Sequence, residues 1–282
     1  MAIKLGIPRS LFYFKYYPLW KTFFEELGVE IITSGKTTKS ILNAGMSVCV
    51  DQACLPIKLF HGHVLELKDK VDYLFIPRFT SISRGEYICP QFGGLPDMVK
   101  NSVKDLPPII DAEINLRKND RDYMKVILQI GRYFCHKDNQ IKKAYKKALK
   151  NFYRYREQIK NGILPSEILE KRIPLAVVEP LKDRKQQSVI NVAVIGHVYN
   201  IYDSFVNMNM LKKLQNMGVR VVTIDTLDEK IINRRAEELD KRMFWHFGNQ
   251  AIGAVKHLNS DKNISGIIYI TSFGCGRDSF AC

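Results

Sequence analysis

The chain has 282 residues, of which 46% are hydrophobic and 26% charged, and this balance is typical of a folded globular protein rather than a disordered or membrane chain. No apolar stretch predicts a membrane span and no leader-like segment opens the chain, so we expect a cytoplasmic protein. The net charge of +14 indicates an anionic partner. Six cysteines in such a chain indicate reduced thiols, and hence metal or redox chemistry rather than a disulfide framework.

Much of the positive charge lies between residues 117 and 172, where lysines recur at helical spacing beside aromatic residues. A long amphipathic helix with a solvated basic face accounts for this pattern. We do not expect a nucleic acid partner, and docking to an acidic protein is the alternative role for the basic face.

The first part of the chain alternates strands and helices. Strands are predicted at residues 3–7, 29–33, 73–76 and 108–112, and helices at residues 11–27, 37–43, 54–67 and 96–103. Residues 73–76 form a continuous apolar run, as a parallel strand buried on both faces requires. Long helices are then predicted over residues 120–162, followed by a crossover at residues 172–188.

The alternation of strands and helices resumes in the last third of the chain. Strands are predicted at residues 191–195, 219–224 and 266–271, and helices at residues 204–217, 228–240 and 245–258. This alternation predicts the α/β class, with two doubly wound, flavodoxin- or Rossmann-like parallel-sheet domains. We place an N-terminal domain at residues 1–115, a helical connecting region at 116–188 and a second domain at 189–282, which we expect to lack its last elements.

Three cysteines lie where such folds place working residues. Cys89 and Cys275 follow predicted strands, and ligands bind beyond the carboxyl ends of parallel strands. Cys54 opens a predicted helix, where the helix dipole favours a thiolate. Glycines flank Cys275 and permit the close approach of a bulky inorganic group, although a tight turn with an incidental cysteine explains this motif equally well.

Prolines accompany two of these cysteines, in the steps Cys54-Leu55-Pro56 and Cys89-Pro90. Such steps recur near cluster ligands, because proline fixes the backbone beside the metal. The wide spacing matches no zinc or ferredoxin signature, so spacing alone does not establish a metal site.

Histidines are weaker candidates than the cysteines. His61 and His63 are two residues apart on one helix and point to different faces, which predicts structural roles. His197 follows a buried strand and is placed to contact a ligand in the crevice.

Taken together, the motifs resemble those of the uncharacterised proteins related to CoA-enzyme activases (DUF2229 type). These are similar to the iron–sulfur component of 2-hydroxyacyl-CoA dehydratases and benzoyl-CoA reductases. The resemblance extends nearly end to end and is carried by Gly6-Ile7-Pro8-Arg9, Cys54-x-Pro56-x-Lys58, His61-Gly62-His63, Ile76-Pro77-Arg78, Cys89-Pro90, Gly196-His197, Tyr199-Asn200, Tyr202-Asp203, Phe244-Trp245, Phe247-Gly248 and Ser272-Phe273-Gly274-Cys275-Gly276.

The resemblance implies a [4Fe–4S] cluster, or a double-cubane iron–sulfur cluster, held by Cys54, Cys89 and Cys275. It also implies an ATP-hydrolysing activator protein with its own iron–sulfur cluster, which delivers a low-potential electron for anaerobic metabolism. The expected role is that of a lyase or reductase component acting on an acyl-CoA or small-molecule substrate, in a homodimer or heterodimer.

The sequence departs from the family pattern in two respects. Val198 and Arg277 occupy positions where relatives tend to have proline, and relatives continue beyond the Phe280 region. The alternatives are a non-catalytic iron–sulfur scaffold or electron-transfer partner, and a zinc or metal-free α/β binding protein with structural cysteines.

Overall fold

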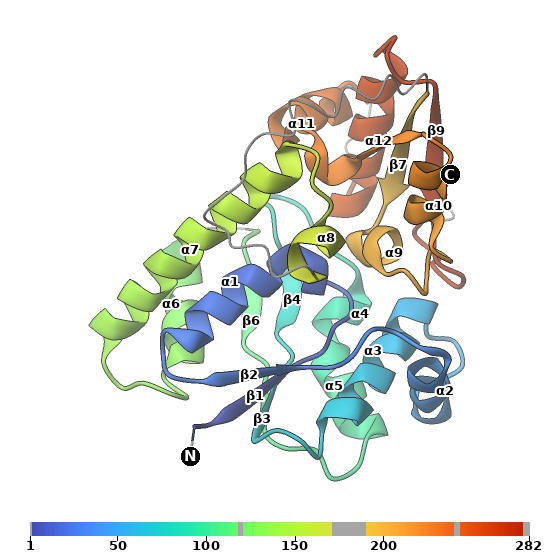
Figure 1. The fold of residues 1–282 in the computed structure, drawn as a ribbon. Coiled ribbons are helices and arrows are strands. Elements are labelled where there is room, and N and C mark those ends of the chain that lie inside the picture. The colour runs from blue at the N-terminus through green and yellow to red at the C-terminus, as the bar shows by residue number, and fades with distance from the viewer. Residues whose placement is uncertain (1, 118–120, 171–189, 240–242, 279–282) are drawn as a thin grey trace. The chain divides into compact units, whose positions relative to one another are not determined.

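The computed structural model describes residues 2–117, 121–170, 190–239 and 243–278. The chain divides into two compact units, residues 1–152 and residues 153–282, and the division falls within the longest helix, α7 (Asp138–Lys160). Each unit is built on a parallel sheet, as the ribbon in Figure 1 shows.

Unit 1 contains a four-stranded parallel sheet in the order β2-β1-β3-β5. Its strands are β1 (Lys4–Ile7), β2 (Glu30–Thr33), β3 (Tyr73–Phe75) and β5 (Ile109–Ile110). The chain leaves β1 toward one edge of the sheet and leaves β3 toward the other. The carboxyl ends of β1 and β3 therefore meet at a topological switch point, where open α/β sheets bind their ligands.

Aromatic residues form much of the core of unit 1. Trp20 and Phe24 lie on α1 (Tyr13–Glu25), and their rings contact Phe75 of β3 with centroids 4.7 and 5.0 Å apart. All three side chains are buried, and aromatic pairs at this separation stabilise a core beyond the area that they bury. The aromatic content of the first helix thus fixes it against the sheet.

The remaining elements of unit 1 surround this core. A small parallel sheet pairs β4 (Arg78–Ser81) with β6 (Glu113–Asn115). The helices are α2 (Lys39–Val48), α3 (Leu55–Leu67), α4 (Pro90–Gly93), α5 (Leu95–Ser102), α6 (Arg121–Gly131) and the first part of α7. Helices α2 and α3 lie side by side.

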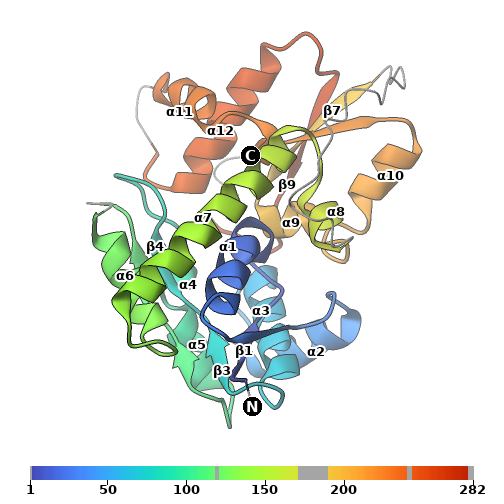
Figure 2. The same ribbon diagram turned by 60° about the vertical axis from the view of Figure 1, so that its left-hand side comes forward.

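Unit 2 contains a three-stranded parallel sheet in the order β8-β7-β9, made of β7 (Asn191–Gly196), β8 (Arg220–Thr223) and β9 (Gly266–Ile270). Its other elements are α8 (Pro165–Glu170), α9 (Val198–Tyr202), α10 (Met210–Asn216), the 3₁₀ turn η1 (Ile224–Thr226), α11 (Glu229–Glu237) and α12 (His246–Asn259). Figures 1 and 2 show α11 and α12 packed side by side. The core between these helices and β7 is apolar and includes Ala193, Ile195, Ile232, Ala254 and Leu258.

The predicted α/β class with parallel sheets is confirmed. One helix starts later than predicted, because residues 204–209 form turns instead and α10 begins only at Met210. Asn207 explains the delay, since its side chain hydrogen-bonds the Ile201 carbonyl oxygen and the Met210 amide, and Met208 and Asn209 adopt left-handed backbone.

The predicted crossover at residues 172–188 lies outside the described residues. The predicted domain boundaries after residues 115 and 188 stay predictions. Within the described part of the chain, no helix combines the length and apolar character needed to cross a bilayer.

Candidate functional site

Cys54 and Cys89 each precede a helix in unit 1. Cys54 is the N-cap of α3, with extended backbone and with Pro56 in the first turn, and Cys89 is the N-cap of α4. Neither cysteine is in a disulfide, and both are half-buried. The Cys54 thiol donates a hydrogen bond to the Gln91 carboxamide oxygen over 3.2 Å. Because Gln91 lies on α4, the starts of α3 and α4 adjoin.

The position of α3 depends on close packing against α2. A Cβ on Gly62 of α3 would overlap the Ile41 carbonyl oxygen, and a Cβ on Gly45 of α2 would overlap the Lys58 carbonyl oxygen. The two helix backbones approach this closely because both positions are glycine. This contact holds the start of α3, and with it Cys54, in place.

Polar contacts tie α3 to the loop after β2. The His63 ring bonds the Ser34 hydroxyl through Nδ1 over 2.9 Å and the Thr37 hydroxyl through Nε2 over 3.0 Å. His61 bonds the Ile57 carbonyl oxygen through Nδ1. Both imidazoles are buried and have protein partners, as predicted. Burial lowers the pKa of His63 to about 4, and repulsion from Arg9 adds to the shift.

In unit 2, the switch point lies between the neighbouring strands β7 and β9. The chain leaves β7 toward β8 at one edge and then returns to β9 at the other. A Cβ on Gly196, at the end of β7, would lie 2.5 Å from the Ile270 carbonyl oxygen, so this glycine permits the close approach of the two strand ends. His197 follows β7 directly, and the loop that carries Cys275 and Asp278 follows β9.

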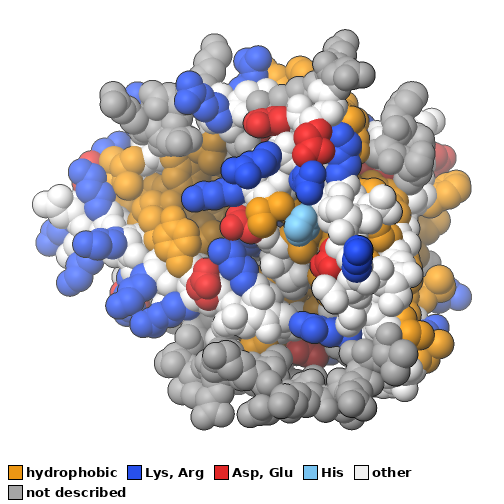
Figure 3. All heavy atoms as spheres, turned by 90° about the horizontal axis from the view of Figure 1, so that it is seen from above, with side chains coloured by type: hydrophobic (Ala, Val, Ile, Leu, Met, Phe, Trp, Pro, Cys, Tyr) orange, Lys and Arg blue, Asp and Glu red, His pale blue; other side chains and the backbone are white. Residues whose placement is uncertain are grey.

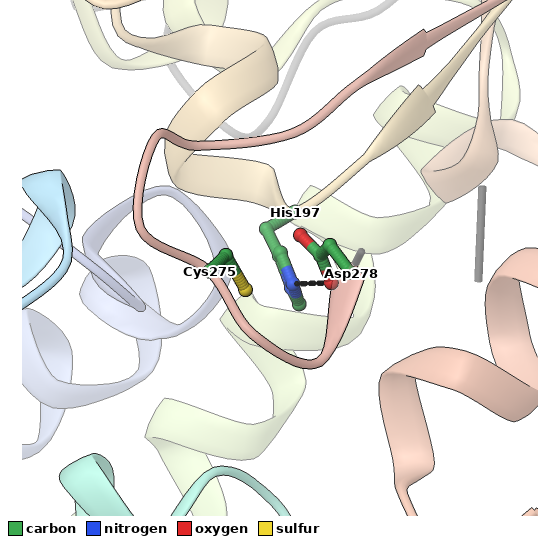
Figure 4. Close-up of side chains that lie close together, drawn as sticks. All are labelled: His197, Cys275 and Asp278. Atoms are coloured by element: carbon green, nitrogen blue, oxygen red, sulfur yellow. Dashed lines mark hydrogen bonds and ion pairs between the residues drawn. The ribbon is translucent and has the colours of Figure 1, made fainter. Parts of the chain in front are cut away.

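These three residues form a compact cluster, drawn in Figure 4. The His197 Nε2 and the Asp278 Oδ1 are 2.9 Å apart, and one ligand atom from each of His197, Cys275 and Asp278 lies within 4.8 Å of the others. His197 and Asp278 are buried, while Cys275 is half-buried. The His197 ring is fixed from two sides, by stacking on Tyr199 and by edge contact with Phe247.

Hydrogen bonds in the cluster converge on the Asp278 carboxylate. Burial alone would raise the pKa of Asp278, but hydrogen bonds from His197 and Cys275 and the charge of Arg277 outweigh it and lower that pKa. Burial raises the pKa of the Cys275 thiol, and the Asp278 charge raises it further. The carboxylate is therefore charged at neutral pH, and it lies between a thiol and an imidazole.

Further contacts hold the loop around the cluster. The Ser272 hydroxyl donates to the Asn200 side-chain oxygen over 2.6 Å, and the Thr271 hydroxyl lies 3.3 Å from Asp278. The Arg277 guanidinium lies over the Trp245 ring, 5.1 Å from its centroid. The cation next to Asp278 therefore packs on an aromatic face.

The predicted ligands thus divide between the units. Cys54 and the turn that carries Cys89 come together in unit 1, whereas Cys275 belongs to unit 2, where it meets His197 and Asp278. The shared three-cysteine site stays a prediction. Asp278 was not predicted as a site residue. In the sequence, Asp278 follows an apolar predicted strand, as His197 does, but the adjacency of these two strands depends on the strand order of the sheet.

Comparison with known families gives one match. A family model described as "CoA enzyme activase uncharacterised domain" (DUF2229) matches residues 4–227. The matched range covers Cys54, Cys89 and His197 and ends before Cys275. No curated protein matches the chain significantly.

Proposed function

Because the chain belongs to the family of CoA enzyme activase uncharacterised domains, we propose that it is the iron–sulfur component of a CoA-enzyme activation system. In this role it receives low-potential electrons from a separate ATP-hydrolysing activator. It uses them for reductive or dehydratase chemistry on an acyl-CoA or another small molecule. The observation that carries the proposal is the family match, which extends over most of the chain and includes Cys54 and Cys89.

The thiols fit an iron–sulfur cluster by their chemistry and exposure. Thiolate sulfur is the ligand that proteins use for such clusters. Cys54, Cys89 and Cys275 form no disulfide and are half-buried, so each residue is partly shielded from bulk water. We assign these three residues as the ligands of a [4Fe–4S] or double-cubane cluster. When bound, the cluster would supply one-electron transfer at low potential.

Groups around Cys54 support a thiolate at that position. The N-terminal end of α3, a helix of 13 residues, is directed at Cys54 and stabilises negative charge there. The Gln91 carboxamide beside the sulfur carries an NH₂ group, which can donate to a thiolate once the side-chain amide rotates. These groups hold and orient the ligand, and they tune its basicity.

The charge of the chain favours an acidic docking partner. Five lysines of α7 are exposed in unit 1, namely Lys142, Lys143, Lys146, Lys147 and Lys150. On the face drawn in Figure 3, Lys and Arg side chains are spread widely, with Asp and Glu among them. We propose that the exposed lysines of α7 meet an acidic face of the activator, which speeds encounter at low salt.

The second candidate is a non-catalytic iron–sulfur scaffold or electron-transfer partner, favoured by the same basic face. Both functions predict a bound cluster. They differ in turnover, because only a catalytic component converts a substrate while its activator hydrolyses ATP. A cluster that survives purification without such turnover favours the scaffold.

The experiment that tests the proposal is anaerobic reconstitution with iron and sulfide, followed by metal analysis and EPR of the dithionite-reduced protein. Cys54→Ala and Cys89→Ala should each lower bound iron and sulfide and alter the EPR signal. The matched control is Cys135→Ala, since Cys135 is also a half-buried cysteine of unit 1 outside any disulfide but lies after α6. Equal iron in folded wild type, both ligand variants and the control would refute the assignment.

A further inference from the structure

The cluster of His197, Cys275 and Asp278 combines three types of metal ligand at one switch point. From its geometry we propose that these residues bind one divalent transition-metal ion of the Zn²⁺ type, with a fourth coordination position open to solvent or substrate. This inference goes beyond the iron–sulfur role and concerns unit 2 alone.

The spacing of the ligand atoms suits a single ion. Zinc lies about 2.0–2.3 Å from nitrogen, oxygen and sulfur ligands, so two ligand atoms of one ion are separated by about 3–4 Å. The three ligand atoms lie within 4.8 Å of one another. Rotamer adjustments of about 1 Å therefore suffice to close the set on one ion.

The charges also suit a divalent cation. A Cys275 thiolate and the Asp278 carboxylate carry two negative charges, which balance those of the ion, and an imidazole that coordinates a metal through nitrogen adds no charge. His197 is 4% and Asp278 5% exposed, and a buried ion needs this compensation. Three protein ligands with one open position are the arrangement of catalytic rather than structural zinc sites.

A nucleophilic triad is the rival interpretation of the same residues. In such a triad the imidazole lies between the nucleophile and the carboxylate, so that it takes the proton of the nucleophile. Here the His197 Nε2 is hydrogen-bonded to Asp278, whereas the buried His197 Nδ1 has no hydrogen-bond partner among the described residues. The imidazole therefore does not bridge the Cys275 thiol and the Asp278 carboxylate. With the three ligand atoms within 4.8 Å of one another, this arrangement favours metal binding.

As a terminal ligand, the Cys275 thiolate binds either this ion or a cluster iron. The two bound forms are therefore alternative states of one thiol, and a divalent ion bound first competes with cluster assembly. Cys54 and Cys89, in contrast, take no part in binding the divalent ion.

Cobalt is the probe for this site, because Co²⁺ replaces Zn²⁺ and a thiolate–cobalt bond absorbs in the near ultraviolet. Titration of the anaerobic, metal-free full chain with CoCl₂ should give this band at one ion per chain. Cys54→Ala, Cys89→Ala and Cys135→Ala should keep the band, whereas Cys275→Ala should abolish it. His197→Gln and Asp278→Asn should each weaken cobalt binding by more than about tenfold.

Circular dichroism checks the fold of each variant. If Asp278→Asn does not fold, the single variants Cys275→Ala and His197→Gln still test the proposed metal site. The proposal is overturned if wild type gives no band, if the band survives in Cys275→Ala, or if His197→Gln binds cobalt as wild type does. Failure of the iron–sulfur proposal is distinguishable, because it leaves the cobalt result in cluster-free protein unchanged.

Discussion

The buried imidazole of His63 should make the stability of the protein depend on pH. Burial and repulsion from Arg9 lower the pKa of His63 from 6.5 to about 4. Between these values the folded protein binds fewer protons than the unfolded chain. The contribution of His63 to stability is therefore fully present above about pH 6.5 and is lost as the pH falls toward 4.

The magnitude follows from the shift. About 2.5 pKa units correspond to about 3 kcal/mol of unfolding free energy, of which about 2 kcal/mol is lost between about pH 7.5 and pH 5. Other groups titrate in this range, so the informative quantity is the difference between wild type and His63→Gln. That difference should shrink by about 2 kcal/mol over the same interval.

Urea unfolding followed by circular dichroism measures this difference. His136→Gln is the control, because it replaces an exposed imidazole, and it should follow wild type at both pH values. The prediction is refuted if the difference in unfolding free energy between wild type and His63→Gln stays constant to within about 0.5 kcal/mol between the two pH values. In that case protonation of His63 would make no contribution to the pH dependence of stability.

Two further substitutions test the packing that positions the two candidate sites. Gly62→Ala should lower the free energy of urea unfolding by about 2 kcal/mol or more, because the new methyl group overlaps the Ile41 carbonyl oxygen. Gly266→Ala is the control, because a Cβ at that position meets no atom of the described residues within contact distance. Equal stability of the two variants would contradict the close contact between α2 and α3. Tyr202→Phe should cost about 1–3 kcal/mol in the same assay, because the buried hydroxyl bonds Thr223 and Asp225. A loss below about 0.5 kcal/mol would mean that these hydrogen bonds add no net stability.

The fold was predictable where apolar runs are continuous. The predicted segments contain or overlap all strands of the two main sheets, namely β1, β2, β3, β5, β7, β8 and β9. Apolar runs of this kind are typical of strands in parallel sheets. The small sheet of β4 and β6 was missed, since its strands are short and mix polar with apolar residues. The short helices α4 and α9 likewise fall below the length at which helical periodicity can be recognised.

The candidate sites were predictable only in part. Helix starts and strand ends indicated Cys54, Cys89 and Cys275, since those are positions along the chain. The meeting of His197 with Asp278 depends on β7 lying beside β9, and periodicity carries no information on strand order. Likewise, the glycine contact between α2 and α3 needs a knowledge of which helices pack together.

The most direct test of the iron–sulfur proposal is the iron and acid-labile sulfide content of anaerobically reconstituted wild-type protein, measured per folded chain. The iron–sulfur proposal predicts about four iron and four sulfide ions per chain for a single cubane, with the colour and EPR signal of a cluster that accepts one electron. Folded protein that retains less than about one iron per chain after reconstitution would contradict it.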